Sequence, residues 1–201
     1  MTDMNSTAKK EKRVILLRKS SIDDLDFIID ALASGEGYTK EEDRTNQNEE
    51  RVKICRYLDE NYNFGPNEID NCPKFTYLAI DDKTQKRVGF ILFTVRDFNT
   101  PGFQDFGIFD KIDRSLFPKD GRFCEIFDLW IDSDYRRQGI ATQLKLKAEE
   151  IATIYNLKMV YTHTEEDNPH VIELNRKLGY KIIRTGVLWD EVIRVSLIKW
   201  I

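Results

Sequence analysis

Residues 124–141 read CEIFDLWIDSDYRRQGIA, and the apolar pattern changes there from that of a strand to that of a helix. The β-rich run 123–131 predicts a strand. A polar turn follows over 132–137, and from Gln138 apolar residues recur every three or four positions as far as Tyr155. That spacing predicts a helix with one buried face that begins directly after the turn.

The turn into this helix is expected to bind an anion. Backbone N–H groups at a helix N-terminus point outward, and the helix dipole favours negative charge there. Gly139 lets the backbone come close to a ligand, small Ala141 leaves the first turn uncrowded, and Arg136 and Arg137 add positive charge. An ordinary strand-to-helix turn with solvated arginines has the same pattern, so the turn alone does not decide its function.

The rest of the chain predicts an α/β domain with the element order β-α-α-β-β-β-α-β-α-β-β. The expected helices span 22–33, 49–60, 138–155 and 169–178, and the expected strands span 14–20, 75–80, 88–96, 123–131, 157–164, 180–184 and 191–200, the last two joined around Gly186. Ser21 and Asn168 are the expected N-caps of the first and last helices. No internal repeat or linker divides the pattern, so we expect a flexible tail at 1–13 and one domain at 14–201.

Two segments lack a regular pattern. Residues 34–50 are rich in acids, which is typical of a solvated surface, although a substrate lid is the alternative. Residues 97–121 hold five phenylalanines, two prolines and three glycines. A loop of that length and composition is either part of a binding surface or an Ω-loop folded over the core.

Composition narrows the classes of partner. With 31 basic and 35 acidic residues among 201, the formal net charge is −4, which argues against bulk electrostatic binding to nucleic acid or to an anionic membrane. No apolar run approaches the ~20 residues of a membrane span, and the start of the chain lacks the apolar core of a signal peptide. Cys55, Cys72 and Cys124 form no CxxC pair, so we expect neither a disulfide framework nor a metal site, and a cytoplasmic location.

Two motifs together resemble the GNAT superfamily of acetyl-CoA-dependent N-acetyltransferases. They are DLWIDSDYRRQGIATQL at 128–144 and NPHVIELNRKLGY at 168–180. Their wording is most similar to the aminoglycoside 3-N-acetyltransferase and diamine acetyltransferase branches. The resemblance implies a mixed, mostly antiparallel sheet with helices on both faces. It also implies that the chain transfers an acetyl group from acetyl-CoA to a primary amine of a small molecule or peptide.

The resemblance further implies which residues hold acetyl-CoA, with no metal involved. Leu129, Trp130 and Ile131 would offer backbone groups to the pantetheine arm. The pyrophosphate would be held by the turn and first helical residues, namely Arg136, Arg137, Gln138, Gly139, Ile140, Ala141 and Thr142. Asn168 matches a family asparagine near the pantetheine, although its role as a helix N-cap explains it equally well.

Direct acetyl transfer needs a base for the amine and a hydrogen-bond donor for the oxyanion. The candidate bases, in order of preference, are Asp128, Glu125 and His163. Strand alternation places the two carboxylates on opposite faces unless a bulge intervenes. A histidine near its ordinary pKa would be a good base at neutral pH, although a structural histidine is the alternative. The oxyanion donor is expected to be a backbone N–H at a bulge near Leu129–Ile131.

One residue departs from the family pattern. Asn175, the last of the residues that the resemblance places at the cofactor, stands where the family usually has the tyrosine that protonates the leaving thiolate. An amide can donate a hydrogen bond but cannot deliver a proton. Either the thiolate leaves unassisted, or Tyr161 or Tyr38 substitutes. The alternative function is therefore a non-catalytic acyl-CoA sensor or interaction module.

The surplus of acids favours a cationic acceptor, and the C-terminal strands with Trp189 and Trp200 could form a homodimer edge.

Overall fold

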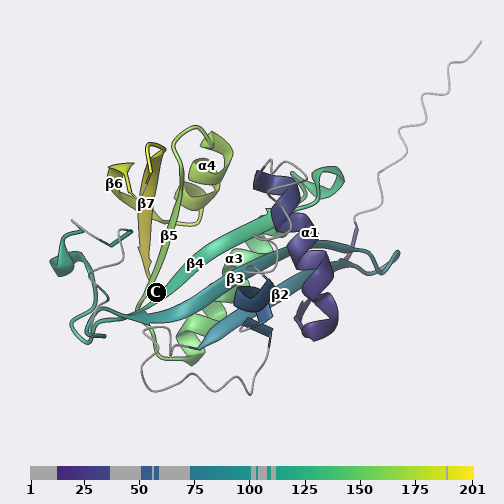
Figure 1. Ribbon diagram of the computed structural model, residues 1–201, viewed down its shortest axis with the longest axis horizontal. Helices are drawn as coiled ribbons and strands as arrows, with labels where there is room; N and C mark the ends of the chain where they lie inside the picture. The colour runs from purple at the N-terminus through teal and green to yellow at the C-terminus, as the bar shows by residue number, and fades with distance from the viewer. Residues whose placement is uncertain are drawn as a thin grey trace, which may run out of the picture.

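The central element of the fold is a seven-stranded sheet with helices on both faces (Figure 1). The computed structural model describes residues 13–36, 51–55, 57–58, 73–100, 103, 108–109, 112–188 and 190–201. The predicted tail before Arg13, most of the acidic segment 34–50, Tyr38, Cys72 and Trp189 lie outside these residues. Within them, the mixed α/β fold expected from the sequence is confirmed.

The elements follow the predicted order. They are β1 (Ile15–Lys19), the 3-10 turn η1 (Ile22–Asp24), α1 (Leu25–Glu36), β2 (Lys74–Asp81), β3 (Arg87–Asp97), η3 (Arg114–Leu116), β4 (Arg122–Ile131), η4 (Ser133–Tyr135), α3 (Ile140–Ile154), β5 (Met159–Glu165), α4 (Pro169–Lys177), β6 (Lys181–Val187) and β7 (Ile193–Trp200). Residues 51–55 and 57–58 are also helical, within the helix expected at 49–60.

The strand order across the sheet is β1-β2-β3-β4-β5-β7-β6. Every neighbouring pair is antiparallel except β4 and β5, which are parallel. That parallel pairing extends only over Cys124–Ile126 and Val160–Thr162. Beyond it the two strands diverge, and Figure 1 shows them spreading apart like the arms of a V. We call this opening the β4–β5 fork.

Two hydrophobic clusters fix α1 and α3 on opposite faces. On one face, Leu144 and Ile151 of α3 pack against Phe93 and Ile126 of the sheet. On the other face, Ile28 of α1 packs in a cluster with Phe90 and Leu92. Burial of apolar surface on both sides makes β3 an almost continuous apolar strand, as expected for a central strand of a covered sheet.

The described residues of the aromatic segment 97–121 cover part of the core. Its side chains Phe98, Phe103, Phe109 and Phe117 are all buried, and they surround Phe123 of β4 and Tyr161 of β5. The ring centroids of Phe98 and Phe117 are 4.4 Å apart. For the described part of this segment, the structure confirms the interpretation as a loop folded over the core. It lies on the α1 face, over the half of the sheet that α1 leaves uncovered.

Several predicted boundaries differ from the structure, and two of these differences concern glycines. The long helix begins at Ile140 instead of Gln138, because Gly139 has φ = 81° and acts as its N-cap. Gly186 was expected in the turn between the last two strands, but it pairs with Arg194 inside β6. Strand β6 therefore continues to Val187, and the turn follows later.

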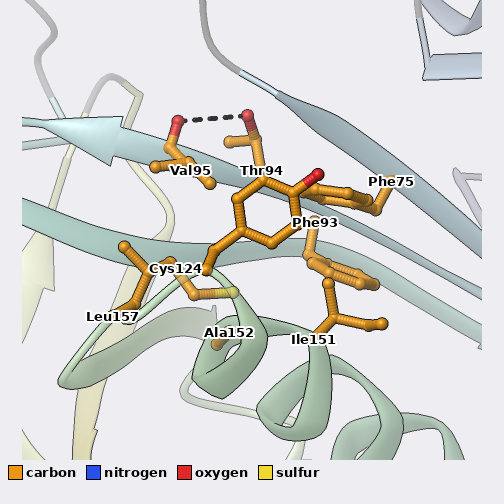
Figure 2. Close-up of a pocket in the computed structure, with 9 residues that line it drawn as sticks. Phe75, Phe93, Thr94, Val95, Cys124, Ile151, Ala152 and Leu157 are labelled. Carbon is orange, nitrogen blue, oxygen red and sulfur yellow. Dashed lines mark hydrogen bonds between the residues drawn. The ribbon is translucent and has the colours of Figure 1, made fainter. Parts of the chain in front are cut away.

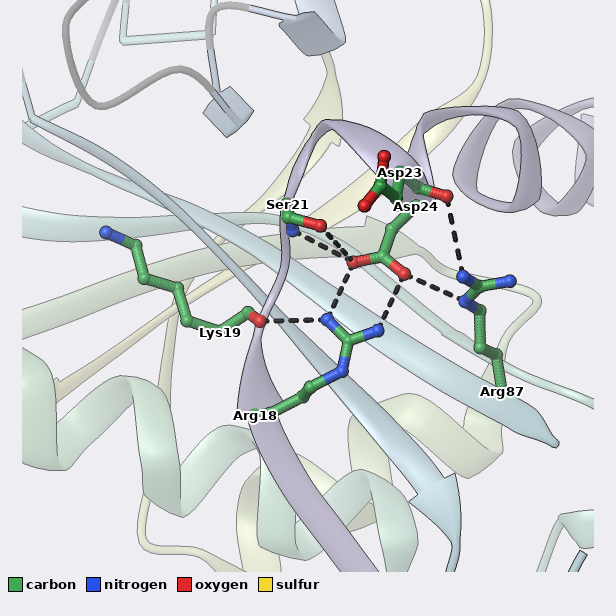
Figure 3. A network of polar contacts seen from close by, with 6 residues as sticks. All are labelled: Arg18, Lys19, Ser21, Asp23, Asp24 and Arg87. Carbon is green, nitrogen blue, oxygen red and sulfur yellow. Dashed lines mark hydrogen bonds and ion pairs between the residues drawn. The ribbon is translucent and has the colours of Figure 1, made fainter. Parts of the chain in front are cut away.

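A buried carboxylate anchors the start of α1 to the sheet (Figure 3). Asp24 is fully buried and accepts two hydrogen bonds from Arg18, at 2.7 and 2.8 Å, and one from Nε of Arg87 at 2.8 Å. The backbone N–H of Ser21 donates a fourth at 2.9 Å. Burial alone would raise the pKa of Asp24, but these hydrogen bonds and the two guanidinium charges lower that pKa below its ordinary value.

We expect Asp24→Asn to lower the free energy of unfolding by about 2 kcal/mol at pH 7, because it removes charge-assisted hydrogen bonds from two arginines. Since the pKa is lowered in the folded state, the carboxylate stabilises the fold above about pH 4, where an unfolded aspartate is ionised. This contribution is lost as the pH falls through the lowered folded pKa. Urea unfolding at pH 7 and pH 3 measures both effects, with exposed Asp23→Asn as control. Equal stability of Asp24→Asn and wild type at pH 7 would contradict the account.

Candidate functional site

A bulge in β4 places two candidate carboxylates on one face of the sheet. Phe93 lies opposite Ile126, whereas Leu92 lies opposite Asp128, so Phe127 is an extra residue in β4. The extra residue cancels the alternation that would otherwise separate Glu125 from Asp128. Both therefore lie on the α1 face. The bulge expected near Leu129–Ile131 was predicted too late in the strand.

The register explains that difference. Leu129, Trp130 and Ile131 pair regularly with Ile91, Phe90 and Gly89, one residue each. Regular pairing with β3 uses one edge of β4. The other edge faces the β4–β5 fork, because the pairing with β5 ends at Ile126. Backbone groups on that edge can bind an extended ligand as an added strand would.

Glu125 is held in a buried ion pair. Its side chain is 2% exposed, and its Oε2 accepts a hydrogen bond from Nε of Arg96 at 2.6 Å. The Arg96 guanidinium also lies 5.5 Å from the ring centroid of Phe127. Burial and the ion pair with Arg96 fix the Glu125 carboxylate beside the fork. Asp128, three residues further along β4, is only half-buried.

Tyr161 and His163 of β5 lie on the same face as Glu125. Tyr161 pairs with Glu125 in the ladder, and its hydroxyl is 3.0 Å from Oγ of Ser196. Burial, with the charge of Glu125, raises the pKa of Tyr161 to about 12. Burial and the charges of Arg194 and Arg184 lower the pKa of His163 to about 4. His163 is therefore neutral at pH 7 but is a weaker base than an ordinary histidine.

Side-chain hydrogen bonds hold the turn before α3 in place. The hydroxyl of buried Tyr135 donates a hydrogen bond to Asp81 at 2.9 Å. Nε of Arg136 donates to the carbonyl of Ile131 at 3.0 Å, and Gln138 donates to the carbonyl of Asp134 at 3.1 Å. These contacts tie the turn to the end of β4. Two of the predicted pyrophosphate residues therefore also stabilise the turn through their side chains.

The N-terminus of α3 is open to a ligand. The first turn is closed by a hydrogen bond from the N–H of Gln143 to the carbonyl of Gly139, 3.1 Å long, so the N–H groups of residues 139–142 have no intrahelical acceptor. A Cβ atom built on Gly139 would meet nothing within 4 Å. Nη1 of Arg137 lies 3.3 Å from Nδ1 of His170 in α4. The residues fit an anionic group at this position.

Helix α4 carries the other two predicted cofactor residues. Asn168 is its N-cap, with the side chain accepting from the N–H of Val171 at 3.4 Å, as one of its two predicted roles required. Asn175 is fully buried. Neither its Nδ2 nor its Oδ1 has a hydrogen-bond partner among the residues that the structure describes. Such a pair of buried polar atoms is unusual in a folded protein.

Neither of two other spaces in the structure is lined by the predicted site residues. One is an apolar gap of about 150 Å³ between β3 and α3, lined by Phe75, Phe93, Cys124 and other side chains (Figure 2), with no room for a water molecule. Burial raises the pKa of the Cys124 thiol well above its ordinary value, so this thiol is not reactive. The other is an open groove of about 460 Å³ between α4 and the β6–β7 hairpin, lined by Ile172, Arg176 and others.

Sequence reasoning missed three residues that shape the site. Arg96 and Ser196 hold Glu125 and Tyr161, and Tyr135 anchors the turn. Arg96 lies in an apolar strand with the α1-facing residues Phe90 and Leu92, so strand alternation could have marked it as a buried cation in need of an acid. The partners of Ser196 and Tyr135 come from distant elements and carry no local signal. No group of three or more metal-ligating side chains occurs within the described ranges, and no described helix is long and apolar enough to cross a membrane.

Comparison with known proteins defines the class. The model of the acetyltransferase (GNAT) family matches residues 38–180, so the chain belongs to the GNAT family. It is 37% identical over 65 residues to "GCN5-related N-acetyltransferase 6, chloroplastic" of Arabidopsis thaliana, a match that covers 32% of this chain and 23% of that protein. The chain spans less than half the length of the curated relatives that it matches.

Solved structures confirm the fold. The crystal structure of Arabidopsis thaliana NAA60 in complex with acetyl-CoA superposes with a TM-score of 0.63 and 17% identity, covering 94% of this chain and 99% of that one. Mutant forms of the spermidine/spermine N-acetyltransferase SpeG from Vibrio cholerae give 0.59 and 16%, covering 92% and 93%. Both likenesses are to the GNAT fold, and neither decides between the branches that the sequence resembles.

The geometry at Gly139 gives a test with a matched control. Gly139 (φ = 81°) and Gly179 (φ = 90°) are both in the left-handed region, so alanine at either position strains the backbone by about 1 kcal/mol. Only Gly139 lies at the predicted anion site. We expect Gly139→Ala to weaken binding of acetyl-CoA at least tenfold in calorimetry, and Gly179→Ala to leave it unchanged. Equal affinity for the two variants would contradict the assignment.

Proposed function

We propose that the chain transfers an acetyl group from acetyl-CoA to a primary amine of a cationic acceptor, by direct attack of the amine on the thioester. The observation that carries the proposal is the β4–β5 fork with the open N-terminus of α3 at its wide end. Family membership and the neighbours solved with acetyl-CoA support it.

The two faces of the sheet would bind different ligands, acetyl-CoA on the α3 side and the acceptor amine on the α1 side. On the α3 side, the N–H groups of residues 139–142, together with Arg136 and Arg137, would hold the pyrophosphate. The fork edge of Leu129–Ile131 would align the pantetheine arm. Bound acetyl-CoA supplies an activated acetyl group as a thioester.

On the α1 side, Asp128 is the proposed base. It is half-buried beside the fork, whereas Glu125 is buried in its ion pair with Arg96. A carboxylate there attracts a cationic amine and accepts its proton, directly or through water. His163 lies on the same face and, with its pKa lowered to about 4, is a poorer acceptor. The backbone N–H at the Phe127 bulge is the proposed oxyanion donor.

A polyamine, an aminosugar or an amine-bearing peptide would satisfy this chemistry. Two proteins that share the fold illustrate this range. NAA60 was solved with a bisubstrate analogue, and SpeG is a spermidine/spermine N-acetyltransferase. We further propose a cytoplasmic location, no nucleic-acid or membrane partner, and a homodimer that uses the exposed C-terminal strands, where Trp200 is 56% exposed.

Release of free thiol from acetyl-CoA with a panel of amines tests the activity. We expect turnover with spermidine, an aminoglycoside or a lysine-bearing peptide, and less with a monoamine of equal size that carries no second positive charge, because Asp128 favours a cation. The alternative is a non-catalytic acyl-CoA sensor, which the asparagine at position 175 favours. Tight binding without thiol release across the panel would favour the sensor and contradict the enzyme.

The choice of base gives a second test. We expect Asp128→Asn to lower kcat at least a hundredfold, since general-base catalysis contributes that much or more. Loss of the much weaker base in His163→Gln should lower it less than tenfold. Asp30→Asn, an exposed carboxylate on α1, is the control. A larger loss in His163→Gln than in Asp128→Asn would reverse the assignment.

A further inference from the structure

The buried amide of Asn175 is a feature that the fold alone does not explain. Its residue is 0% exposed, and both polar side-chain atoms are without a hydrogen-bond partner in the part of the chain that the structure describes. Leaving a buried amide unsatisfied destabilises a protein, and an apolar residue of the same size would avoid that penalty. A buried amide of this kind is explained if its partner arrives with a ligand.

The position of Asn175 on α4 points it toward the sheet. Ile172 and Leu178 pack against the core on the α3 side, and Asn175 lies three residues from each. Residues three apart share a face of a helix. Asn175 therefore lies on the inward stripe of α4, between two side chains that contact the core.

The ends of α4 locate Asn175 along the fork. Helix α4 begins shortly after Glu165, at the wide end of the fork, where the N–H of Glu166 bonds to the carbonyl of Ile193. It ends where Tyr180, whose N–H bonds to the carbonyl of Asn175 at 3.0 Å, leads into β6.

The first residue of β6 lies in the same row of the sheet as Glu125 of β4. Along this row, Lys181 of β6 pairs with Ile198 of β7, Ile198 pairs with Tyr161 of β5, and Tyr161 pairs with Glu125. Glu125 and Tyr161 form the second of the three β4–β5 pairs, so the two strands diverge one pair beyond this row. Asn175 thus lies on the α3 side close to the closed end of the fork.

We propose that Asn175 is a positioning residue whose carboxamide donates a hydrogen bond to a carbonyl, and accepts one from an N–H, of the two secondary amides in the pantetheine arm. This inference rests on the proposed function. A carboxamide offers a carbonyl acceptor and an NH₂ group with two donors, and the two pantetheine amides supply N–H donors and carbonyl acceptors that it can bind. Asn175 then orients the arm in the fork and does not transfer a proton, so the thiolate leaves without help from this side chain.

The test separates ligand binding from folding. Asn175→Leu keeps the number and branching of the side-chain heavy atoms and removes the unsatisfied amide, so we expect thermal unfolding of the ligand-free protein to shift upward by about 2–4 °C. We expect its affinity for coenzyme A to fall by about ten- to a hundredfold, since two hydrogen bonds are lost. Its affinity for adenosine 3',5'-bisphosphate, which lacks the pantetheine amides, should not change.

Thr76 provides the matched control. Its hydroxyl is also buried without a partner among the described residues, but it lies on β2, away from the fork. Thr76→Val should raise stability in the same way and leave coenzyme A affinity unchanged. Equal coenzyme A affinity of Asn175→Leu and wild type would overturn the proposal, whereas failure of the wild type to bind coenzyme A would overturn the proposed function instead.

An isotope-labelled wild-type sample gives a readout that does not depend on a variant folding. The side-chain amide resonances of Asn175 should shift when coenzyme A is added and stay in place with adenosine 3',5'-bisphosphate. Unchanged resonances in saturating coenzyme A would overturn the proposal.

Discussion

The divergence of β4 from β5 after three paired residues is the constraint on which the other features of the site depend. It frees one edge of β4 from the ladder while β3 still holds the other edge. The strand is therefore rigid and yet has backbone groups available to a ligand. Helix α3 starts nine residues after the end of that strand, so its open N-terminus follows the free edge along the chain.

The bulge at Phe127 adds a second consequence. By turning Asp128 to the same face as Glu125, it places a half-buried carboxylate beside a buried one. The buried one is neutralised by Arg96, so the pair does not suffer the repulsion of two adjacent uncompensated charges. Under the proposed function, the acceptor would approach from the α1 face, and the pyrophosphate would bind at the N-terminus of α3.

The sequence predicted much of this architecture because its signals are local. The apolar spacing of α3, the N-cap Asn168 and the glycine before α3 all depend on residues a few positions apart. The sequence alone could not show whether a bulge brings Glu125 and Asp128 to the same face, since the bulge depends on the register of β4 against β3. The Glu125–Arg96 pair and the lowered pKa of His163 depend on contacts between distant elements, so no local pattern predicts them.

A crystal structure with acetyl-CoA bound tests the central claim most directly. The account predicts that the pyrophosphate contacts the N–H groups of residues 139–142, that the pantetheine arm lies in the β4–β5 fork, and that the acetyl group reaches the face of Asp128. Acetyl-CoA bound elsewhere, for example in the groove between α4 and the β6–β7 hairpin, with the fork closed, would contradict it.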